Sequence, residues 1–308
     1  MRTLIVGAGA MGNYFAASMK RAGIEVVLYD INQVKVDTIN QQGIKVLDGE
    51  DQWLAQVPIY ADIDEVPTPE LIIILVKSYA TERAAREIMW TKDEDTLVLT
   101  LQDGLGNAEE IEKHIPKRQV FVGVTYQNAY EVEPGVVKNT GSGLTIVAPR
   151  QKAALPSAMA LARLFNNCRI AAGATSDIEP ILWKKLIVSS AIGPLSAIYE
   201  LPSGKLPKNP DAVRDMMELV LEGVMVAQKV NVPLDYGEMW ATVLETCRTM
   251  ADNLSAMLLD VQNGRSTEIN AINGSIIRIA ETYGIDTPAN VRVLRSVTAK
   301  RKKQQDRL

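Results

Sequence analysis

The sequence predicts an α/β protein with a doubly wound, mostly parallel sheet in its first half and a mostly helical second domain. Three observations predict it. Short apolar runs alternate with amphipathic stretches up to about residue 173, and long stretches with helical apolar spacing follow. A chain of 308 residues is also longer than one hydrophobic core usually needs. We therefore expect one domain over residues 1–173 and a second over residues 174–308.

The strands and helices follow from the spacing of apolar residues. Short apolar runs predict strands at residues 3–6, 26–29, 71–76, 96–101, 120–125 and 144–147. Amphipathic stretches between them predict helices at residues 13–22, 32–42, 80–89 and 108–114. Glu133-Pro134-Gly135 predicts a hairpin turn, so we expect the late strands to be antiparallel additions. In the second domain, helical spacing covers residues 181–198, 212–231, 237–259 and 267–283.

The composition excludes several classes of function. The 33 basic and 37 acidic side chains give a net charge of −4, so no basic excess indicates a nucleic-acid partner. The single histidine, His114, excludes a two-histidine metal site, and Cys168 and Cys247 are too few for a structural zinc site or a disulfide framework. We expect no metal and a reducing, cytoplasmic location. The longest apolar runs have the length of strands, so no membrane segment is expected.

A glycine loop follows the first predicted strand and opens the first predicted helix. Its residues are Gly7, Ala8, Gly9, Ala10, Met11 and Gly12. In this context the first glycine permits a tight turn, the second lets the backbone approach a pyrophosphate, and the third allows close helix–strand packing. The pattern predicts a Rossmann dinucleotide site, and a purely structural glycine turn is the alternative.

Asp30 ends the second predicted strand, 23 positions after Gly7, where an acidic residue meets the adenosine ribose. A carboxylate there accepts hydrogen bonds from the ribose hydroxyls and repels a 2′-phosphate. No arginine occurs in residues 31–35, and Lys35 is the nearest cation. We therefore expect NAD(H) as the preferred cofactor, with NADP(H) left open. The alternative for Asp30 is a helix-capping role.

Nine segments in this order make the chain resemble the ketopantoate reductase (2-dehydropantoate 2-reductase) family. They are the glycine loop and residues 75–77 (LVK), 102–107 (QDGLGN), 123–125 (GVT), 183–186 (WKKL), 194–197 (PLSA), 253–260, 265–274 and 287–290 (TPAN). The resemblance implies a Rossmann domain followed by a helical domain of the phosphogluconate dehydrogenase type. It also implies NAD(P)H-dependent reduction of ketopantoate to pantoate, a step of pantothenate and coenzyme A biosynthesis.

The same resemblance assigns residues to the site. Lys185 is similar to the catalytic lysine of the family and Glu268 to its acidic partner, which also contacts the cofactor. Lys77 and Asp103 correspond to positions beside both cofactor and substrate. The chemistry agrees, because hydride arriving at a carbonyl carbon leaves negative charge on oxygen, and an ammonium supplies both a cation and a proton. Without the resemblance, Lys184 and Lys185 would be a solvated pair on a helix and Glu268 an ordinary helix residue.

The substrate-binding set implied by the resemblance includes departures from the family pattern. This set is Lys77, Asp103, Lys185, Ser189, Gly193, Asn253 and Ser255. Asp103 stands where the family commonly has asparagine, and its charge disfavours an anionic substrate unless it pairs with Lys185 or Lys77. Ser189 and Gly193 replace asparagines, and Ala256 replaces a serine.

These departures leave the identity of the 2-keto acid open. One alternative is therefore an NADH-dependent reductase of another branched or aromatic 2-keto acid, a D-2-hydroxyacid dehydrogenase. A non-catalytic dinucleotide sensor is the alternative from a different class, although a sensor needs no proton donor. We expect a small-molecule 2-keto acid as the only partner besides a second copy of the chain, because apolar helical surface favours a homodimer.

Overall fold

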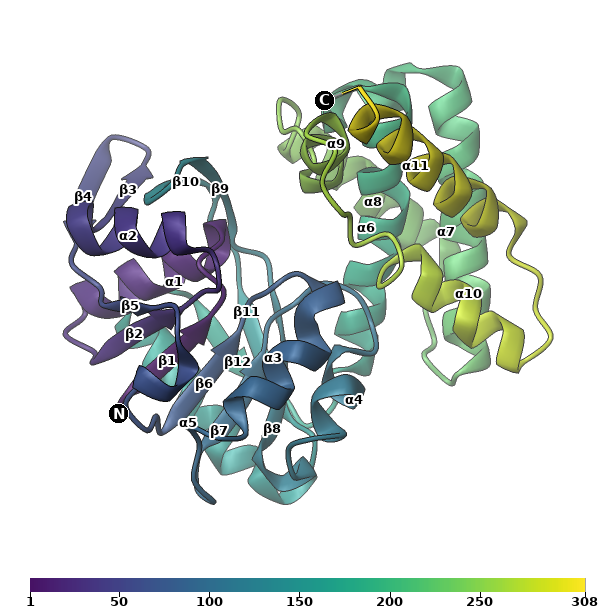
Figure 1. The fold of residues 1–308 in the computed structure, drawn as a ribbon. Helices are drawn as coiled ribbons and strands as arrows, with labels where there is room; N and C mark the ends of the chain where they lie inside the picture. Colours follow the sequence, from purple (N-terminus) through teal and green to yellow (C-terminus); the bar gives the residue numbers. More distant parts are fainter. Residues whose placement is uncertain (308) are drawn as a thin grey trace. The chain divides into compact units, whose positions relative to one another are not determined.

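The computed structural model describes residues 1–307, and the chain folds into two compact units (Figure 1). The first unit contains Met1–Gln102 and Asn107–Ile178. The second contains the residues from Glu179 onward. It also contains Asp103–Gly106, a short loop that belongs to this unit by its contacts although the residues on either side of it belong to the first. The sequence places the boundary after residue 173, and in the structure the helical unit, apart from the loop 103–106, begins at Glu179 instead of residue 174.

The first unit is built on an eight-stranded sheet, and the predicted doubly wound Rossmann fold is confirmed. The strand order is β12-β11-β8-β7-β6-β1-β2-β5. The strands are β1 (Thr3–Val6), β2 (Val26–Tyr29), β5 (Ile59–Tyr60), β6 (Leu71–Ile74), β7 (Leu97–Thr100), β8 (Val120–Thr125), β11 (Thr145–Pro149) and β12 (Ala172–Ala174). Because β1 lies between β2 and β6 and is parallel to both, the strand order reverses there, which is where such folds bind ligands.

Five helices accompany this sheet (Figure 1). They are α1 (Ala10–Arg21), α2 (Gln33–Gln42), α3 (Thr81–Ile88), α4 (Asn107–Glu112) and α5 (Leu155–Asn167). The strands β1 and β6 are buried at every residue, because helices cover both faces of the sheet. The helix α5, with apolar residues such as Leu161 and Phe165 in the core, was not among the predicted elements.

A separate four-stranded sheet in the first unit, with the order β4-β3-β10-β9, was not predicted. Its strands are β3 (Ile44–Asp48), β4 (Asp51–Ala55), β9 (Asn128–Glu133) and β10 (Val136–Gly141). The predicted hairpin turn at 133–135 is confirmed, since β9 and β10 pair antiparallel. The antiparallel addition to the main sheet is β11 on β8, whereas β9 and β10 join β3 and β4 and pack against α1.

The second unit is helical, as predicted, with α6 (Glu179–Tyr199) at its centre. The other helices are α7 (Pro210–Lys229), α8 (Tyr236–Thr249), α9 (Ala256–Gln262), α10 (Asn273–Thr282) and α11 (Pro288–Gln305). By length and composition alone α6 could cross a membrane, but it packs against α7, α8, α9 and α11, and its apolar side chains form the core of this unit.

Two of the predicted helices were wrong in extent. The stretch 237–259 is two helices, because Ser255 accepts a hydrogen bond from the Leu258 N–H (3.0 Å) and begins α9. Backbone N–H groups of Ser203 and Gly204 bind the carbonyls of Asn253 and Ala251 in the intervening turn. The stretch 267–283 becomes an α-helix only at Asn273.

A proline inside α6 is compensated by a side chain from α10. Pro194 has no N–H, so the carbonyl of Ser190, four residues earlier, lacks its helical donor. The buried Asn273 side chain donates to that carbonyl (3.1 Å) and also to Asn290 Oδ1 (3.0 Å). Asn290 in turn donates its side-chain amide to the carboxylate of Glu222 (2.7 Å). This chain of hydrogen bonds connects α6, α10, α11 and α7.

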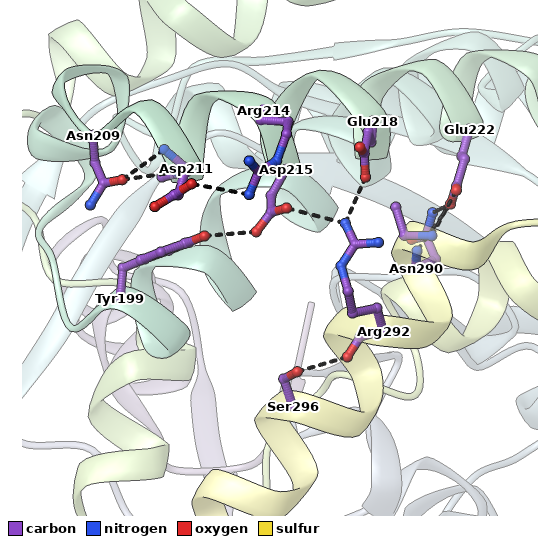
Figure 2. A network of polar contacts seen from close by, with 12 residues as sticks. Tyr199, Asn209, Asp211, Arg214, Asp215, Glu218, Glu222, Asn290, Arg292 and Ser296 are labelled. Atoms are coloured by element: carbon purple, nitrogen blue, oxygen red, sulfur yellow. Dashed lines mark hydrogen bonds and ion pairs between the residues drawn. The ribbon is translucent and has the colours of Figure 1, made fainter.

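Carboxylates on one face of α7 hold the start of α11 (Figure 2). Glu222 is buried and accepts from the backbone N–H groups of Ala289 (2.7 Å) and Asn290 (3.0 Å), which the first turn of α11 leaves unpaired. Glu218 and Asp215, one and two turns earlier on α7, accept hydrogen bonds from Arg292 (2.6 and 3.1 Å). The spacing of these three carboxylates is that of one helix face.

Candidate active site

The glycine loop requires glycine at two of its positions. Gly7 has φ +108°, and a Cβ there would lie 2.9 Å from the Val76 backbone nitrogen. A Cβ on Gly12 would overlap the Gly7 carbonyl oxygen, because α1 begins directly against the turn. The Gly7 N–H donates to the carbonyl of Tyr29 at the end of β2 (2.8 Å). The first and third glycines of the motif therefore have the packing roles that the sequence predicts.

The start of α1 fits an anionic pyrophosphate. Gly9 is the N-cap residue, with no capping side chain and no acidic residue in the first turn. Gly9, Ala10 and Met11 are partly exposed, and a Cβ on Gly9 would meet no atom within 4 Å. The N–H groups that begin this helix thus have no capping side chain and carry its positive dipole end, which is the arrangement that binds phosphate groups.

Asp30 lies beside the same loop, at the end of β2. Its Oδ2 accepts a hydrogen bond from the Ala8 N–H (2.7 Å), and its Oδ1 accepts one from the Asn32 N–H (2.9 Å). The helix cap of α2 is Asn32, whose side chain accepts from the Lys35 N–H (3.2 Å), so the capping alternative for Asp30 is wrong. A carboxylate oxygen can accept more than one hydrogen bond, so these contacts are compatible with the predicted contact to ribose.

The carbonyl of Ala8 also has side-chain partners, which the sequence analysis missed. Asn13 Nδ2 donates to it (3.2 Å), and so does Lys35 Nζ (3.1 Å). Lys35 also binds both carboxylate oxygens of Glu131 on β9 (2.9 and 2.8 Å). Asn13 is fully buried, whereas the Lys35 and Glu131 side chains are 21% and 25% exposed.

In the helical unit, Lys185 lies on α6 and forms an ion pair with Asp103. Its neighbour Lys184 is exposed, whereas the Lys185 side chain is only 21% exposed. Ser189 and Gly193 follow Lys185 at intervals of one turn, so the three residues share one face of α6. The pairing that the sequence analysis required of Asp103 is therefore present.

The loop that carries Asp103 is fixed to the helical unit by its backbone. Leu105 N–H donates to the carbonyl of Ala271 (3.1 Å). Gly104 has φ +90°, and a Cβ at this position would overlap the Ala271 carbonyl oxygen. Glycine is therefore needed at this position, and the close backbone contact holds Asp103 beside α6.

Three further predicted residues lie in the same unit. The Ser255 hydroxyl donates to the Gly193 carbonyl (3.2 Å), which brings it to the Lys185 face of α6, and it also caps α9. Asn253 lies in the turn before α9, where its carbonyl accepts from the Ser203 N–H (3.0 Å). Glu268 is half-buried, and its carbonyl accepts the Ala271 and Ile272 N–H groups in the turn before α10. Ala256 is the exposed first residue of α9.

Lys77 belongs to the first unit, three residues after β6, and its carbonyl accepts the Ala80 N–H (2.8 Å) at the start of a 3₁₀ turn. The buried Gln102 holds this segment, since its Nε2 donates to the Val76 carbonyl (2.7 Å) and to Thr81 Oγ1 (2.8 Å). This support was not predicted. Its signal in the sequence is a glutamine directly after the predicted strand 96–101. Within residues 1–307, no three His, Cys, Asp or Glu side chains are grouped so that they could hold a metal ion.

Comparison with known proteins identifies the family to which this chain is similar. The model of the ketopantoate reductase PanE/ApbA family matches residues 3–152, and the model of its C-terminal domain matches residues 177–301. A 2-dehydropantoate 2-reductase of Pyrococcus abyssi is 31% identical over 94% of this chain and 95% of its own length. That of Aquifex aeolicus is 30% identical over 97% of both chains.

Solved structures agree with the sequence matches. A ternary structure of D-mandelate dehydrogenase with NADH and anilino(oxo)acetate superposes with a TM-score of 0.94, at 29% identity over 99% of both chains. A PanE/ApbA family ketopantoate reductase from Ralstonia eutropha superposes with a TM-score of 0.90, at 29% identity over 99% of this chain and 100% of its own. The chain therefore belongs to the ketopantoate reductase PanE/ApbA family.

Proposed function

We propose that this protein is an NADH-dependent reductase of a 2-keto acid, with the reduction of ketopantoate to pantoate as the leading reaction. The observation that carries the proposal is the ion pair between Asp103 and Lys185, which is half-buried on α6. The chain also belongs to the ketopantoate reductase family and has a glycine loop with open space at Gly9. We assign dinucleotide binding to the first unit and substrate binding to the helical unit.

The reaction needs a hydride and a proton. When bound, the reduced nicotinamide supplies the hydride to the carbonyl carbon. Lys185 supplies the proton: as the C=O π bond breaks, its electron pair becomes the new O–H bond to a proton from the ammonium. The amine left behind recovers a proton from water. The cation also stabilises the charge that develops on oxygen, which is the larger part of such catalysis.

Asp103 positions that ammonium. An ammonium group has three N–H donors, so an ion pair with one carboxylate leaves it able to donate to a carbonyl oxygen as well. The pairing also neutralises Asp103, whose charge would otherwise repel the carboxylate of a 2-keto acid. We assign Glu268 and Lys77 to the same reaction because they match family positions, with Lys77 beside cofactor and substrate.

A second candidate substrate is an aromatic 2-keto acid. The specific observation is the likeness to D-mandelate dehydrogenase, together with Asp103 and Ala256, which depart from the pattern expected for ketopantoate. Either substrate gives the same reaction class. A non-catalytic dinucleotide sensor would not need the ion pair between Lys185 and Asp103.

We infer that the cofactor is NADH rather than NADPH. The carboxylate of Asp30 is fixed beside the loop by the Ala8 and Asn32 N–H groups, where it would accept from a ribose hydroxyl and repel a 2′-phosphate. Lys35, the nearest cation in sequence, binds Glu131. The D-mandelate dehydrogenase structure contains NADH.

The remaining proposals concern assembly and location. Met217, Leu221 and Met225 form an exposed apolar stripe along α7, with 44, 48 and 46% exposure, and this supports a homodimer. Both cysteines are buried free thiols, and burial raises the pKa of each to about 11. Two buried cysteines that form no disulfide with each other support the expected cytoplasmic location.

A substrate panel tests the proposed function. NADH oxidation is followed with ketopantoate, 2-ketoisovalerate, phenylglyoxylate and pyruvate. We expect turnover with ketopantoate to exceed that with the other three. If phenylglyoxylate is the best substrate, the second candidate is correct. If none is reduced while NADH still binds, the protein is a sensor and the proposal fails.

The Lys185→Ala variant tests the proton donor. Loss of the ammonium should lower kcat by roughly two to four powers of ten, because both proton transfer and charge stabilisation are lost. The dissociation constant for NADH should stay within about threefold, since the glycine loop belongs to the other unit. Lys184→Ala, an exposed neighbour on the same helix, is the matched control. Near-normal turnover of Lys185→Ala would reject the assignment.

The Asp30→Ala variant tests the ribose contact. The variant loses an acceptor for the ribose and the anchor of the Ala8 N–H, and hydrogen bonds to charged groups are worth about 1.5–3 kcal/mol each. The dissociation constant for NADH, measured by calorimetry, should rise at least tenfold by this estimate. Asp37→Ala removes an exposed carboxylate from α2 and should leave it unchanged. An Asp30→Ala variant with wild-type affinity for NADH would show that this carboxylate does not contact the cofactor.

A further inference from the structure

The ion pair between Lys35 and Glu131 has no role in the reaction described above. Lys35 is the third residue of α2, and Glu131 lies on β9 of the four-stranded sheet. Lys35 Nζ is 2.9 and 2.8 Å from the two Glu131 oxygens and 3.1 Å from the Ala8 carbonyl oxygen. These contacts account for three acceptor atoms, which equals the number of N–H donors of an ammonium.

The position of this pair is defined by Ala8. Asp30 binds the N–H of Ala8 and Lys35 binds its carbonyl, so the two side chains hold the same residue of the glycine loop. In dinucleotide folds the acidic residue at the end of the second strand meets the 2′-hydroxyl of the adenosine ribose. Lys35 is therefore a cation beside the place where the 2′-phosphate of NADPH would lie.

A cation in this place should favour NADPH, but Glu131 neutralises it. The two side chains are only 21% and 25% exposed, so water and salt screen their interaction less than that of a fully exposed pair. A 2′-phosphate that approached Lys35 would compete with the Glu131 carboxylate and would be repelled by its charge. The pair as a whole offers the phosphate no net positive charge.

We propose that Glu131 determines the preference for NADH by occupying Lys35. The specificity of the dinucleotide site is then set by a residue from a second sheet, 96 positions from the lysine that it neutralises. This inference rests on the proposed NADH-dependent function, and it adds a residue to which no other role is assigned.

The test is a set of four proteins: wild type, Glu131→Gln, Lys35→Met and the double variant. The dissociation constants of NADH and NADPH are measured by calorimetry at one low ionic strength, and their ratio is compared. The local charge of the pair is zero in the wild type and the double variant, positive in Glu131→Gln and negative in Lys35→Met.

The ratio of the NADPH constant to the NADH constant should follow that charge. It should fall about tenfold in Glu131→Gln and rise several-fold in Lys35→Met, and it should return to within about threefold of the wild-type value in the double variant. Taking the ratio removes any equal effect on both cofactors from loss of the Lys35 contact to Ala8. Glu133→Gln, which removes the exposed carboxylate two residues along β9, should leave the ratio unchanged.

Two results would overturn the inference. One is the same ratio in all four proteins. The other is a ratio in the double variant as low as in Glu131→Gln, since Glu131 would then act without Lys35. A protein that shows the expected ratios but reduces no 2-keto acid would contradict the proposed function alone. Thermal unfolding of each variant, followed by circular dichroism, checks that binding is compared between folded proteins.

Discussion

The nucleotide half of this protein depends on how the peptide groups of one residue, Ala8, are held. Its N–H is bound by Asp30 and its carbonyl by Asn13 and Lys35, so three side chains from α1, α2 and the end of β2 fix the centre of the glycine loop. Gly7 and Gly12 flank this residue in the motif, and a Cβ at either position would meet backbone atoms at less than 3.0 Å. The contacts of Ala8 also fix the position of the N-terminus of α1, because its N-cap residue Gly9 follows Ala8 directly.

The helical half depends on a side-chain hydrogen bond that replaces the one missing at Pro194. The proline removes a hydrogen bond from α6, and Asn273 replaces the missing donor at Ser190 while also binding Asn290. Ser255 donates to the Gly193 carbonyl beside the same proline. Lys185 lies two turns before this point, so the packing of α9 and α10 onto the proline segment also orients the face of α6 that carries the lysine.

The two halves differ in how they tolerate change. In the glycine loop, backbone contacts fix the geometry, and a single Cβ at Gly12 would displace the start of α1. At Lys185 the geometry rests on an ion pair and on the loop 103–106, where Gly104 contacts Ala271. A substitution beside Lys185 would therefore mainly change side-chain contacts, whereas a side chain at Gly12 would move backbone.

Much of the fold was predictable, because local patterns determine it. The strands β1, β2 and β8 have the bounds that the sequence predicts, since each is a short apolar run between turn residues. The four-stranded sheet was not predictable, because β10 pairs with β3 about 90 residues earlier in the chain and neither strand is a continuous apolar run. The break at residues 250–255 was missed because helical spacing of apolar residues continues through it.

The candidate site shows the same division. The glycine loop and Asp30 were found from the sequence because their spacing is local. The resemblance named Lys185 and Asp103. The sequence left open whether Asp103 pairs with Lys185 or with Lys77, and the structure shows the pair with Lys185. The Lys35–Glu131 pair had no sequence signal, since nothing in the chain relates a helix residue to a strand 96 positions later.

We propose that this protein transfers a hydride from NADH to the carbonyl carbon of a 2-keto acid, with ketopantoate as the leading substrate. The direct measurement is isotopic: the enzyme is supplied with ketopantoate and with NADH that carries deuterium at C4 of the nicotinamide, in each of the two stereochemical positions separately. We expect one of the two labelled forms to give pantoate with deuterium on C2, detected by mass spectrometry. Pantoate free of deuterium from both forms would contradict the hydride transfer, and no pantoate at all would contradict ketopantoate as the substrate.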